Sequence, residues 1–378
     1  METNQSDGAA QHRNRNRLLA VACAAVAAAC LLVSDGVLRS AALVGAGLEL
    51  PHGAGSLLSG APSPGEVWDI TAPTAAAITW GGAQESGKDF DITATPKDIL
   101  LLMEEAVDEF ADQTRDGDIR AKTYTAGDGT HRWGRLSARN TTTTQPERKL
   151  SKDLAAPMEL KVDKTKPAVL IFHSHTTEGF EILDRPWYAV GWNSRTENGQ
   201  KSVVRVGDAI AQMLERAGFQ VVHDTTIYDR QYTGAYDKSR AAVLRWLAEY
   251  PSIQVTLDVH RDAIHTNDGV HIRPLTEIGG KKAAQVMIIT GCEEGGVTNF
   301  PNWAQNLSFA TKLHMAAEET YPGLMRPLFF CQRKYNMDVT PFSLLLEMGA
   351  DANTLEEAVY SGRLIGESLA RLLENYVL

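Results

Sequence analysis

The chain has 378 residues and a formal net charge of −10, from 37 Lys and Arg against 47 Asp and Glu. Hydrophobic residues make up 43% and charged residues 22%, which excludes a disordered chain, a collagen-like fibre and a polytopic membrane protein. The acidic balance argues against a bulk nucleic-acid-binding protein, because no basic excess exists to neutralise phosphates. Four cysteines without a CxxC pair are too few for a disulfide scaffold.

The amino-terminal segment has the pattern of a membrane anchor. Residues 1–17 are polar and end in a cluster of arginines, and the stretch that follows, LLAVACAAVAAACLLV, carries no charge. This stretch is nearly as long as a transmembrane helix of about 17–25 residues and slightly longer than a signal-peptide core of about 7–15. Basic residues before it and Asp35 after it predict a cytoplasmic tail and an extracytoplasmic body. We therefore expect an uncleaved single-pass anchor at 18–34 in the cell membrane, with cleavage as the alternative.

Two segments of different texture follow the expected anchor. Residues 35–88 are rich in Gly, Ala, Ser and Pro with little periodicity, which predicts a linker. Residues 89–160 are expected to form a small accessory segment ahead of a larger catalytic domain at 161–378. Its expected elements are a helix at 96–115, strand-like stretches at 121–124 and 158–162, and a polar loop at 139–144.

In the larger domain, strand patterns alternate with amphipathic helix patterns. Strands are expected at 168–172, 219–222, 253–259, 284–290 and 343–347. Helices are expected at 202–217, 238–250, 302–321 and 354–376. This alternation predicts an α/β fold with a mainly parallel central sheet flanked by helices.

Three of the expected strands end in histidine or carboxylate side chains. The first strand is followed by His173, His175 and Glu178, the third by His260, Arg261 and Asp262, and the fifth ends in Glu347. Ligands of such sheets bind beyond the carboxyl ends of the strands, so we expect these side chains to lie at one edge.

The histidines at this edge predict a zinc site. His173 and His175 are two residues apart, so on an extended backbone they would face the same side. With His260 they give three imidazoles, which suits a catalytic zinc ion that keeps one position open for water. Glu178 is the competing third ligand, because two imidazoles and one carboxylate also bind hydrolytic zinc.

Other residues suggest no competing chemistry. The chain has no GxSxG elbow, no P-loop, no GxGxxG after a strand and no HExxH motif. His223, after the second strand, is expected to support the site or contact the substrate. We expect His265 and His271 to be solvated and His314 to lie on a helix surface.

Four ordered segments of the chain resemble one known family. They are VLIFHSHTTEGF, VVRVGDAIAQMLERAGFQVVHDTT, DVHRDA and LLLEMGADANTLEEA. Together they are similar to the stage II sporulation protein P family over about residues 155–378, with an anchored amino end. The resemblance implies a membrane-anchored peptidoglycan hydrolase of spore-forming bacteria, similar in fold to zinc-dependent N-acetylmuramoyl-L-alanine amidases.

The resemblance also implies roles for individual residues. It places His175 and His260 at two zinc-ligand positions and Glu347 at the position of the catalytic glutamate. The third ligand stays open among His173, Glu178 and Glu197. Arg261 would stabilise the oxyanion or hold a substrate carboxylate, with a structural salt bridge to Asp262 as the alternative.

The implied reaction is zinc-dependent cleavage of the amide between the muramic acid lactyl group and L-alanine, together with cleavage of peptide cross-links. The implied partners are a sporulation glycan-strand transglycosylase and a third membrane protein of the engulfment complex. Two other functions remain open. One is a catalytically silent wall-binding or scaffold protein, and the other is a zinc metallopeptidase that acts on proteins.

Overall fold

The computed structural model describes residues 90–133, 135–143, 152 and 156–378. All of them belong to one unit, Ser63–Leu378. The expected tail, anchor and linker, residues 1–88, lie outside the described residues. Within the described part of the chain, none of the helices is long and apolar enough to cross a membrane.

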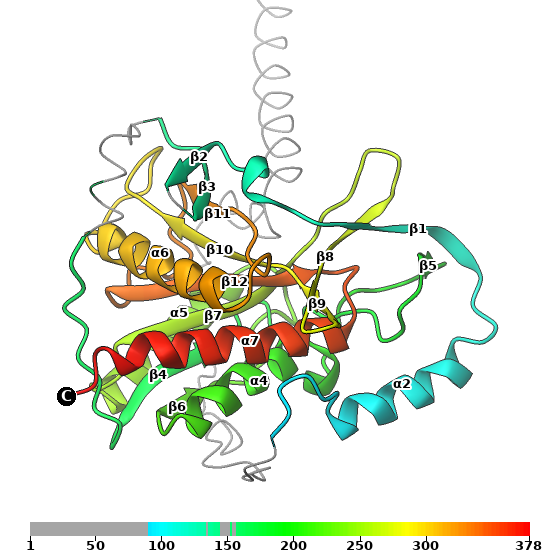
Figure 1. The fold of residues 1–378 in the computed structure, drawn as a ribbon, viewed down its shortest axis with the longest axis horizontal. Coiled ribbons are helices and arrows are strands. Elements are labelled where there is room, and N and C mark those ends of the chain that lie inside the picture. The colour runs from blue at the N-terminus through cyan, green and yellow to red at the C-terminus, as the bar shows by residue number, and fades with distance from the viewer. Residues whose placement is uncertain (1–89, 134, 144–151, 153–155) are drawn as a thin grey trace, which may run out of the picture. The chain divides into compact units, whose positions relative to one another are not determined.

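An eight-stranded mixed sheet runs through the centre of the fold (Figure 1). In spatial order its strands are β2 (His131–Trp133), β3 (Leu136–Asn140), β11 (Leu328–Cys331), β10 (Val286–Gly291), β12 (Phe342–Ala350), β7 (Val255–Asp262), β4 (Pro167–Phe172) and β6 (Gln220–His223). Neighbours are parallel except in the pairs β2–β3 and β10–β12. The predicted α/β class is confirmed, but the sheet is mixed, with an antiparallel pair at its centre.

The antiparallel pair arises from the way the chain leaves β7. Parallel neighbours need a long crossover, usually a helix. Here β7 is followed by the hairpin of β8 (His271–Ile278) and β9 (Lys281–Ala284), and β10 begins directly after Gln285. The chain therefore re-enters the large sheet at the end where β7 left it, and Val286 at the start of β10 pairs with Met348 near the end of β12.

A second, four-stranded sheet was not predicted. Its order is β5 (Trp187–Ala189), β1 (Arg115–Lys122), β8 and β9, with only β1 and β8 parallel among these pairs. The β8–β9 turn consists of Gly279 and Gly280, whose φ angles of 59° and 78° are readily adopted by glycine. The expected helix at 96–115 is shortened to α2 (Lys97–Glu109), because β1 starts at Arg115.

Helices cover both faces of the large sheet. Figure 1 shows α4 (Val203–Arg216), α6 (Trp303–Thr320) and α7 (Leu355–Glu374) on the near face and α5 (Ala235–Glu249) behind it; 3₁₀ turns lie at Ala126–Asp128 and Gly199–Lys201. Successive side chains of β4 point to opposite faces of the sheet, which explains this layering. Val169 and Ile171 belong to the larger core with α4 and α7, whereas Leu170 and Phe172 pack in a smaller core with Trp246 of α5.

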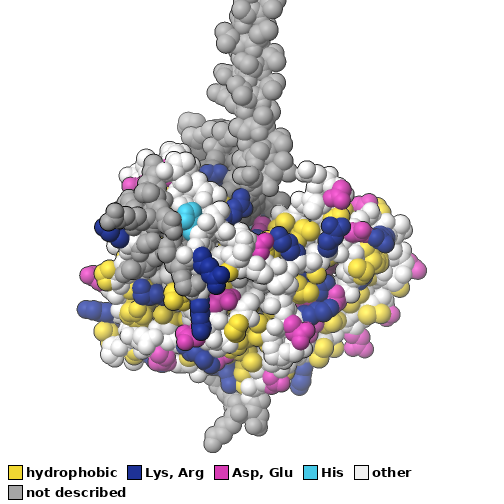
Figure 2. Space-filling view, turned by 45° about the horizontal axis from the view of Figure 1, so that its top comes forward, with side chains coloured by type: hydrophobic (Ala, Val, Ile, Leu, Met, Phe, Trp, Pro, Cys, Tyr) yellow, Lys and Arg dark blue, Asp and Glu magenta, His cyan; other side chains and the backbone are white. Residues whose placement is uncertain are grey.

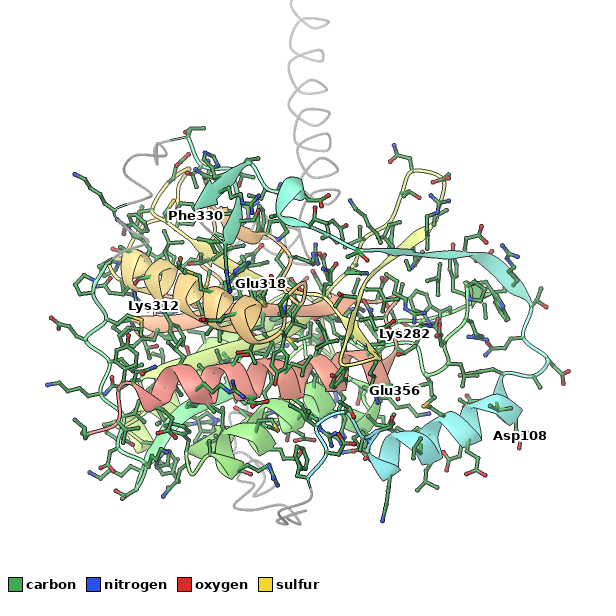
Figure 3. All side chains as sticks on the ribbon, viewed as in Figure 1. Asp108, Lys282, Lys312, Glu318, Phe330 and Glu356 are labelled. Atoms are coloured by element: carbon green, nitrogen blue, oxygen red, sulfur yellow. The ribbon has the colours of Figure 1, made fainter. Side chains whose placement is uncertain are left out.

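The start of α7 is fixed on both sides of its first turn, directly after β12. Thr354 and Glu357 form a capping box, in which the Thr354 hydroxyl accepts from the Glu357 N–H at 3.2 Å and the Glu357 carboxylate accepts from the Thr354 N–H at 3.1 Å. On the other side, Glu356 (labelled in Figure 3) accepts from Lys281 of β9 at 2.9 Å. These contacts hold the chain that leaves the carboxyl end of β12.

Candidate functional site

Strand register brings the predicted site segments to one edge of the large sheet. β12, β7 and β4 are adjacent and parallel. Glu347 of β12 pairs with His260 of β7, and Phe172 at the end of β4 pairs with Asp258 of β7. The segment that follows Phe172 therefore starts at the edge where His260 and Glu347 lie.

The buried imidazole of His260 lies between two carboxylates. Its Nε2 is 2.8 Å from Asp258 and its Nδ1 is 3.2 Å from Glu178. Asp258 is itself held by the N–H and hydroxyl of Ser174, at 2.8 and 2.6 Å. Burial alone would lower the pKa of His260, but the two carboxylates raise it well above its usual value. Burial alone would raise the pKa of Glu178, but His260 and Arg261 lower it below its usual range.

His175 completes a cluster with His260 and Glu178. Its ring is buried, and its centroid lies 5.4 Å from that of His260, with the two rings nearly perpendicular. One face of His175 stacks on Tyr232 at 4.7 Å, and the ring of Tyr236 meets it edge-on at 5.3 Å. These aromatic contacts fix the orientation of the imidazole.

Glu347 lies beside this cluster with no hydrogen-bond donor from the described residues. Its side chain is fully buried, and neither carboxylate oxygen has a hydrogen-bond partner within the described part of the chain. Burial and the charges of Asp262 and Glu178 raise the pKa of Glu347 well above its usual value. Buried carboxyl groups are normally hydrogen-bonded, so this arrangement costs stability and makes Glu347 a candidate functional residue.

His173 does not join the cluster, although its spacing from His175 predicted that it would. β4 ends immediately before it and residues 174–177 form a turn, so the alternation of an extended chain no longer applies. The Nδ1 of His173 donates to the carbonyl of Val259 at 2.8 Å, and its Nε2 lies 2.8 Å from the Nε2 of His223. Both ring nitrogens are thus engaged away from the candidate ligands.

The buried imidazoles of His173 and His223 and the partly exposed carboxylate of Asp208 form a hydrogen-bonded chain. Burial and the nearby His223 lower the pKa of His173 to about 3, so the ring is neutral and its Nε2 accepts a hydrogen bond from the Nε2–H of His223. The Nδ1 of His223 donates to Asp208 at 3.0 Å. Burial alone would raise the pKa of Asp208, but His223 lowers it. Through His173, this chain supports the backbone of β7 at Val259, next to His260.

We expect Gly207→Ala to destabilise the fold by about 1–3 kcal/mol. A Cβ at Gly207 of α4 would lie 2.5 Å from the Nε2 of His223 and 2.9 Å from the ring of His173. Helix propensity alone would favour alanine by about 1 kcal/mol. A decrease in the free energy of unfolding would therefore show that the steric contact with the two imidazoles outweighs helix propensity. Urea unfolding is the measurement, with Gly199→Ala as control because its nearest neighbour is 3.4 Å away. Unchanged or increased stability of Gly207→Ala would contradict the expectation.

Arg261 connects loops rather than facing the candidate ligands. Its Nε donates to the Gly179 carbonyl at 3.0 Å, and its Nη2 donates to the carbonyl and hydroxyl of Ser194 at 3.0 and 2.9 Å. The alternative salt bridge to Asp262 is also not formed. The carboxylate of Asp262 pairs instead with Arg326 at 2.9 Å, and Arg261 reaches only the carbonyl of Asp262.

Arg195 is a site residue that the sequence analysis missed. It donates to Asp229 at 2.6 Å, lies 3.6 Å from Glu178 and packs over the ring of Tyr232. It belongs to a loop without a motif, so no sequence signal marked it. Glu197, two residues on, does not approach the cluster: its side chain is 58% exposed and pairs with Arg230 at 3.1 Å.

A cavity of about 260 Å³ adjoins the cluster through Arg195. It is lined by residues 179–182 and 189–196, together with Phe110, Gln113, Arg185 and Lys201. Three cationic side chains therefore line the cavity, and of these Arg195 lies 3.6 Å from Glu178.

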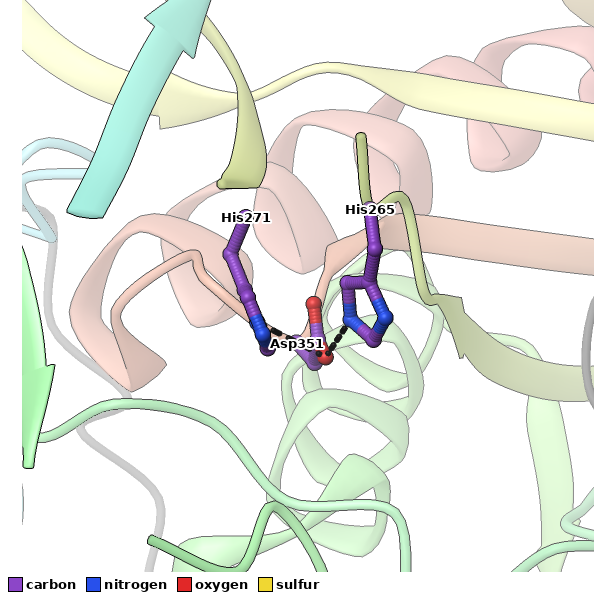
Figure 4. Close-up of side chains that lie close together, drawn as sticks. All are labelled: His265, His271 and Asp351. Atoms are coloured by element: carbon purple, nitrogen blue, oxygen red, sulfur yellow. Dashed lines mark hydrogen bonds and ion pairs between the residues drawn. The ribbon is translucent and has the colours of Figure 1, made fainter. Parts of the chain in front are cut away.

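Three further histidines have contacts that the sequence analysis did not predict. His314 is buried rather than on the surface, and its Nε2 lies 3.2 Å from the carbonyl of Arg326. His265 and His271 were expected to be solvated. The side chain of His265 is 42% exposed and that of His271 is 12% exposed, and both contact Asp351 (Figure 4).

Comparisons with known proteins identify the family of this chain. The model of the stage II sporulation protein P (SpoIIP) family matches residues 102–370. Stage II sporulation protein P of Bacillus subtilis (strain 168) is 31% identical over 204 residues, which is 51% of this chain and 47% of that protein, so the chain spans about half the length of this relative.

Two solved structures match the chain at low identity and low TM-score. N-acetylmuramoyl-L-alanine amidase AmiC2 of Nostoc punctiforme is 13% identical with a TM-score of 0.33, covering 57% of this chain and 98% of that chain. An N-acetylmuramoyl-L-alanine amidase of Clostridium difficile 630 is 14% identical with a TM-score of 0.31, covering 56% and 97%. By the match to its family model, the chain belongs to the stage II sporulation protein P family.

Proposed function

We propose that this chain is a zinc-dependent peptidoglycan hydrolase of sporulation, an N-acetylmuramoyl-L-alanine amidase. Family membership supports a role in sporulation. The observation that carries the proposed chemistry is the buried carboxyl group of Glu347, whose oxygens have no donor among the described residues, beside His175, Glu178 and His260.

The donor types of these three residues suit zinc. Two imidazoles and one carboxylate are a ligand set of hydrolytic zinc. The Nδ1 of His260 and the carboxylate of Glu178 lie 3.2 Å apart, close to the roughly 3.3 Å between ligand atoms of a tetrahedral zinc ion. Asp258 engages the Nε2 of His260, which leaves Nδ1 as the ligand atom, and such carboxylate–imidazole pairs orient zinc ligands. We therefore assign His175, Glu178 and His260 as the ligands.

Glu347 is the proposed general base and acid. When bound, zinc would acidify a water molecule and polarise the scissile carbonyl. Glu347 takes a proton from the attacking water and delivers it to the leaving amine of L-alanine. A carboxyl group with a raised pKa suits this exchange, because it takes up and releases protons closer to neutral pH.

Arg195 is the proposed substrate-binding residue in place of Arg261. The donors of Arg261 are directed to protein oxygens, whereas the side chain of Arg195 is 26% exposed and lines the cavity. Stem peptides of peptidoglycan carry carboxylates, which a guanidinium group binds well. Arg185 and Lys201 would add positive charge to the same cavity.

Zymography on purified cell wall separates the proposed function from its alternatives. A hydrolase clears the wall in the gel, whereas a silent scaffold binds without clearing and a protein-specific metallopeptidase leaves the wall intact. We also propose cleavage of peptide cross-links as a second activity, since the family resemblance implies it. The proposed partners are the glycan-strand transglycosylase and the third membrane protein of the engulfment complex, to be tested by co-purification with this chain.

We propose a single-pass membrane location with the catalytic domain outside the cytoplasm. Charges of both signs are interspersed on the face of the described residues seen in Figure 2, and the net charge of −10 does not favour adhesion to anionic wall polymers. The membrane anchor and the partner proteins would therefore hold the enzyme at the cell wall. Reporter fusions after residue 60 are expected to be active only outside the cytoplasm, and activity confined to the cytoplasm would contradict this topology.

A further inference from the structure

A second cluster of possible metal ligands lies apart from the one assigned to catalysis. His265 lies in the loop between β7 and β8 and forms an isolated antiparallel bridge with His271, the first residue of β8, while Asp351 follows β12 (Figure 4). The Nε2 of His265 is 2.8 Å from the Oδ2 of Asp351, and the Nδ1 of His271 is 3.4 Å from the same oxygen. One ligand atom from each residue lies within 4.8 Å of the others.

Hydrogen bonding within the described residues leaves this cluster incomplete. The Nδ1 of His271 and the Oδ1 of Asp351 are buried, and neither has a hydrogen-bond partner in the described part of the chain. Asp351 is 1% exposed, so the free energy cost of an unmatched oxygen there is about 1–3 kcal/mol. A purely hydrogen-bonded role for the cluster does not account for these two atoms.

We propose that His265, His271 and Asp351 bind a second divalent transition-metal ion, with zinc as the preferred one. Two imidazoles and a carboxylate suit zinc, and cobalt or nickel also accept such donors. The separations of 2.8 and 3.4 Å are near the roughly 3.3 Å expected between ligand atoms of a tetrahedral zinc ion. One cation would give the Nδ1 of His271 a partner, and bidentate binding by Asp351 would also engage its Oδ1.

The surroundings of the cluster favour a cation. Glu181 is a second buried carboxylate nearby, and its Oε1 also has no hydrogen-bond partner among the described residues. Arg261 and Arg185 are the neighbouring positive charges, but Arg261 donates to the oxygens of other loops. The rings of Tyr188 and Trp192 pack 4.3 and 5.1 Å from that of His271 and shield one side of the cluster.

The proposed ion would be structural. It would join the β7–β8 loop to the chain that leaves β12, four residues beyond Glu347. The backbone already makes this connection once, where the Asp351 N–H donates to the Asp262 carbonyl at 2.9 Å. A metal bridge beside that bond would hold together the ends of the two strands that carry His260 and Glu347.

The test is the zinc content of the purified full chain, stripped with chelator, reloaded with Zn²⁺ and freed of excess metal. We expect two zinc ions per chain in the wild type and one in His265→Gln and in His271→Gln. His265→Gln is the primary variant, because this side chain is 42% exposed and its replacement should not impair folding. His131→Gln, in β2, is the matched control and should retain two. Loading with Co²⁺ should give visible absorption that falls by about half in His265→Gln.

A double variant separates this site from the catalytic one. His175→Ala with His260→Ala should keep one zinc ion, which is lost when His265→Gln is added. The wild type could instead bind one ion per chain, lost in His265→Gln but kept in the double variant. That result would support the second site and remove the proposed catalytic zinc. Wild-type stoichiometry in both His265→Gln and His271→Gln would overturn the inference and leave the proposed function intact.

Discussion

Glu347→Gln is expected to lower the rate of peptidoglycan hydrolysis by about 10²–10⁴-fold while zinc binding is retained. Glutamine has nearly the same shape but takes up no proton, and Glu347 is proposed as a general base rather than as a ligand. The measurement pairs turnover on purified wall with zinc content. Glu277→Gln, at an exposed position in β8, is the control and should keep full activity.

The free energy of unfolding of Glu347→Gln should not be lower than that of the wild type. Because the pKa of Glu347 is raised from 4.5 in the folded state, the folded protein binds more protons than the unfolded one above about pH 4.5. Its contribution to stability therefore falls as pH rises from 4.5 towards the folded pKa, and glutamine removes that loss. Metal-free Glu347→Gln is expected to unfold at equal or higher urea concentration at pH 7. Loss of zinc would make Glu347 a ligand, and full activity would make it a structural residue.

His260→Ala is expected to abolish zinc binding at the catalytic site and to reduce hydrolysis to background. It should also destabilise the metal-free fold by roughly 3–5 kcal/mol, the usual cost when one partner of a buried ion pair is removed. The reason is that Asp258 and Glu178, at 2.8 and 3.2 Å from the imidazole, would lose the cation between them.

His175→Ala is the matched variant for this prediction. It should remove the same zinc ion, but with a smaller loss of stability, because His175 lies 3.8 Å from its nearest carboxylate, Asp229, rather than between two close ones. Zinc content and urea unfolding of both variants are the measurements. Equal destabilisation by the two changes would contradict the ion-pair account of His260, and full zinc retention in both would remove the catalytic site from consideration.

The central strands and their ends were predictable from the sequence because they depend on local patterns. Buried apolar runs identified β4, β7 and β12, and parallel strands bring their carboxyl ends to one edge, which placed His260 beside Glu347. The antiparallel entry of β10 depends on the β8–β9 hairpin, whose mixed polar sequence gave no strand signal.

Contacts between side chains on loops that are far apart in the sequence could not be predicted. His173 was assigned by the spacing of an extended strand, and a turn directly after β4 redirected it to His223. Arg261 was expected to contact the substrate, but the loop near Ser194 folds back to accept its donors, and Arg195, which no sequence signal marked, lines the cavity. The contact of His265 with Asp351 joins residues 86 positions apart, which no periodicity reveals.

Digestion of purified sacculi with the full chain, followed by mass spectrometry of the released fragments, tests the proposed amidase most directly. The account predicts free stem peptides with a new amino-terminal L-alanine and glycan strands that lack them. Release should stop on chelation and return with Zn²⁺, and it should be nearly absent with Glu347→Gln. Fragments without new L-alanine termini, or release that chelator leaves unchanged, would contradict it.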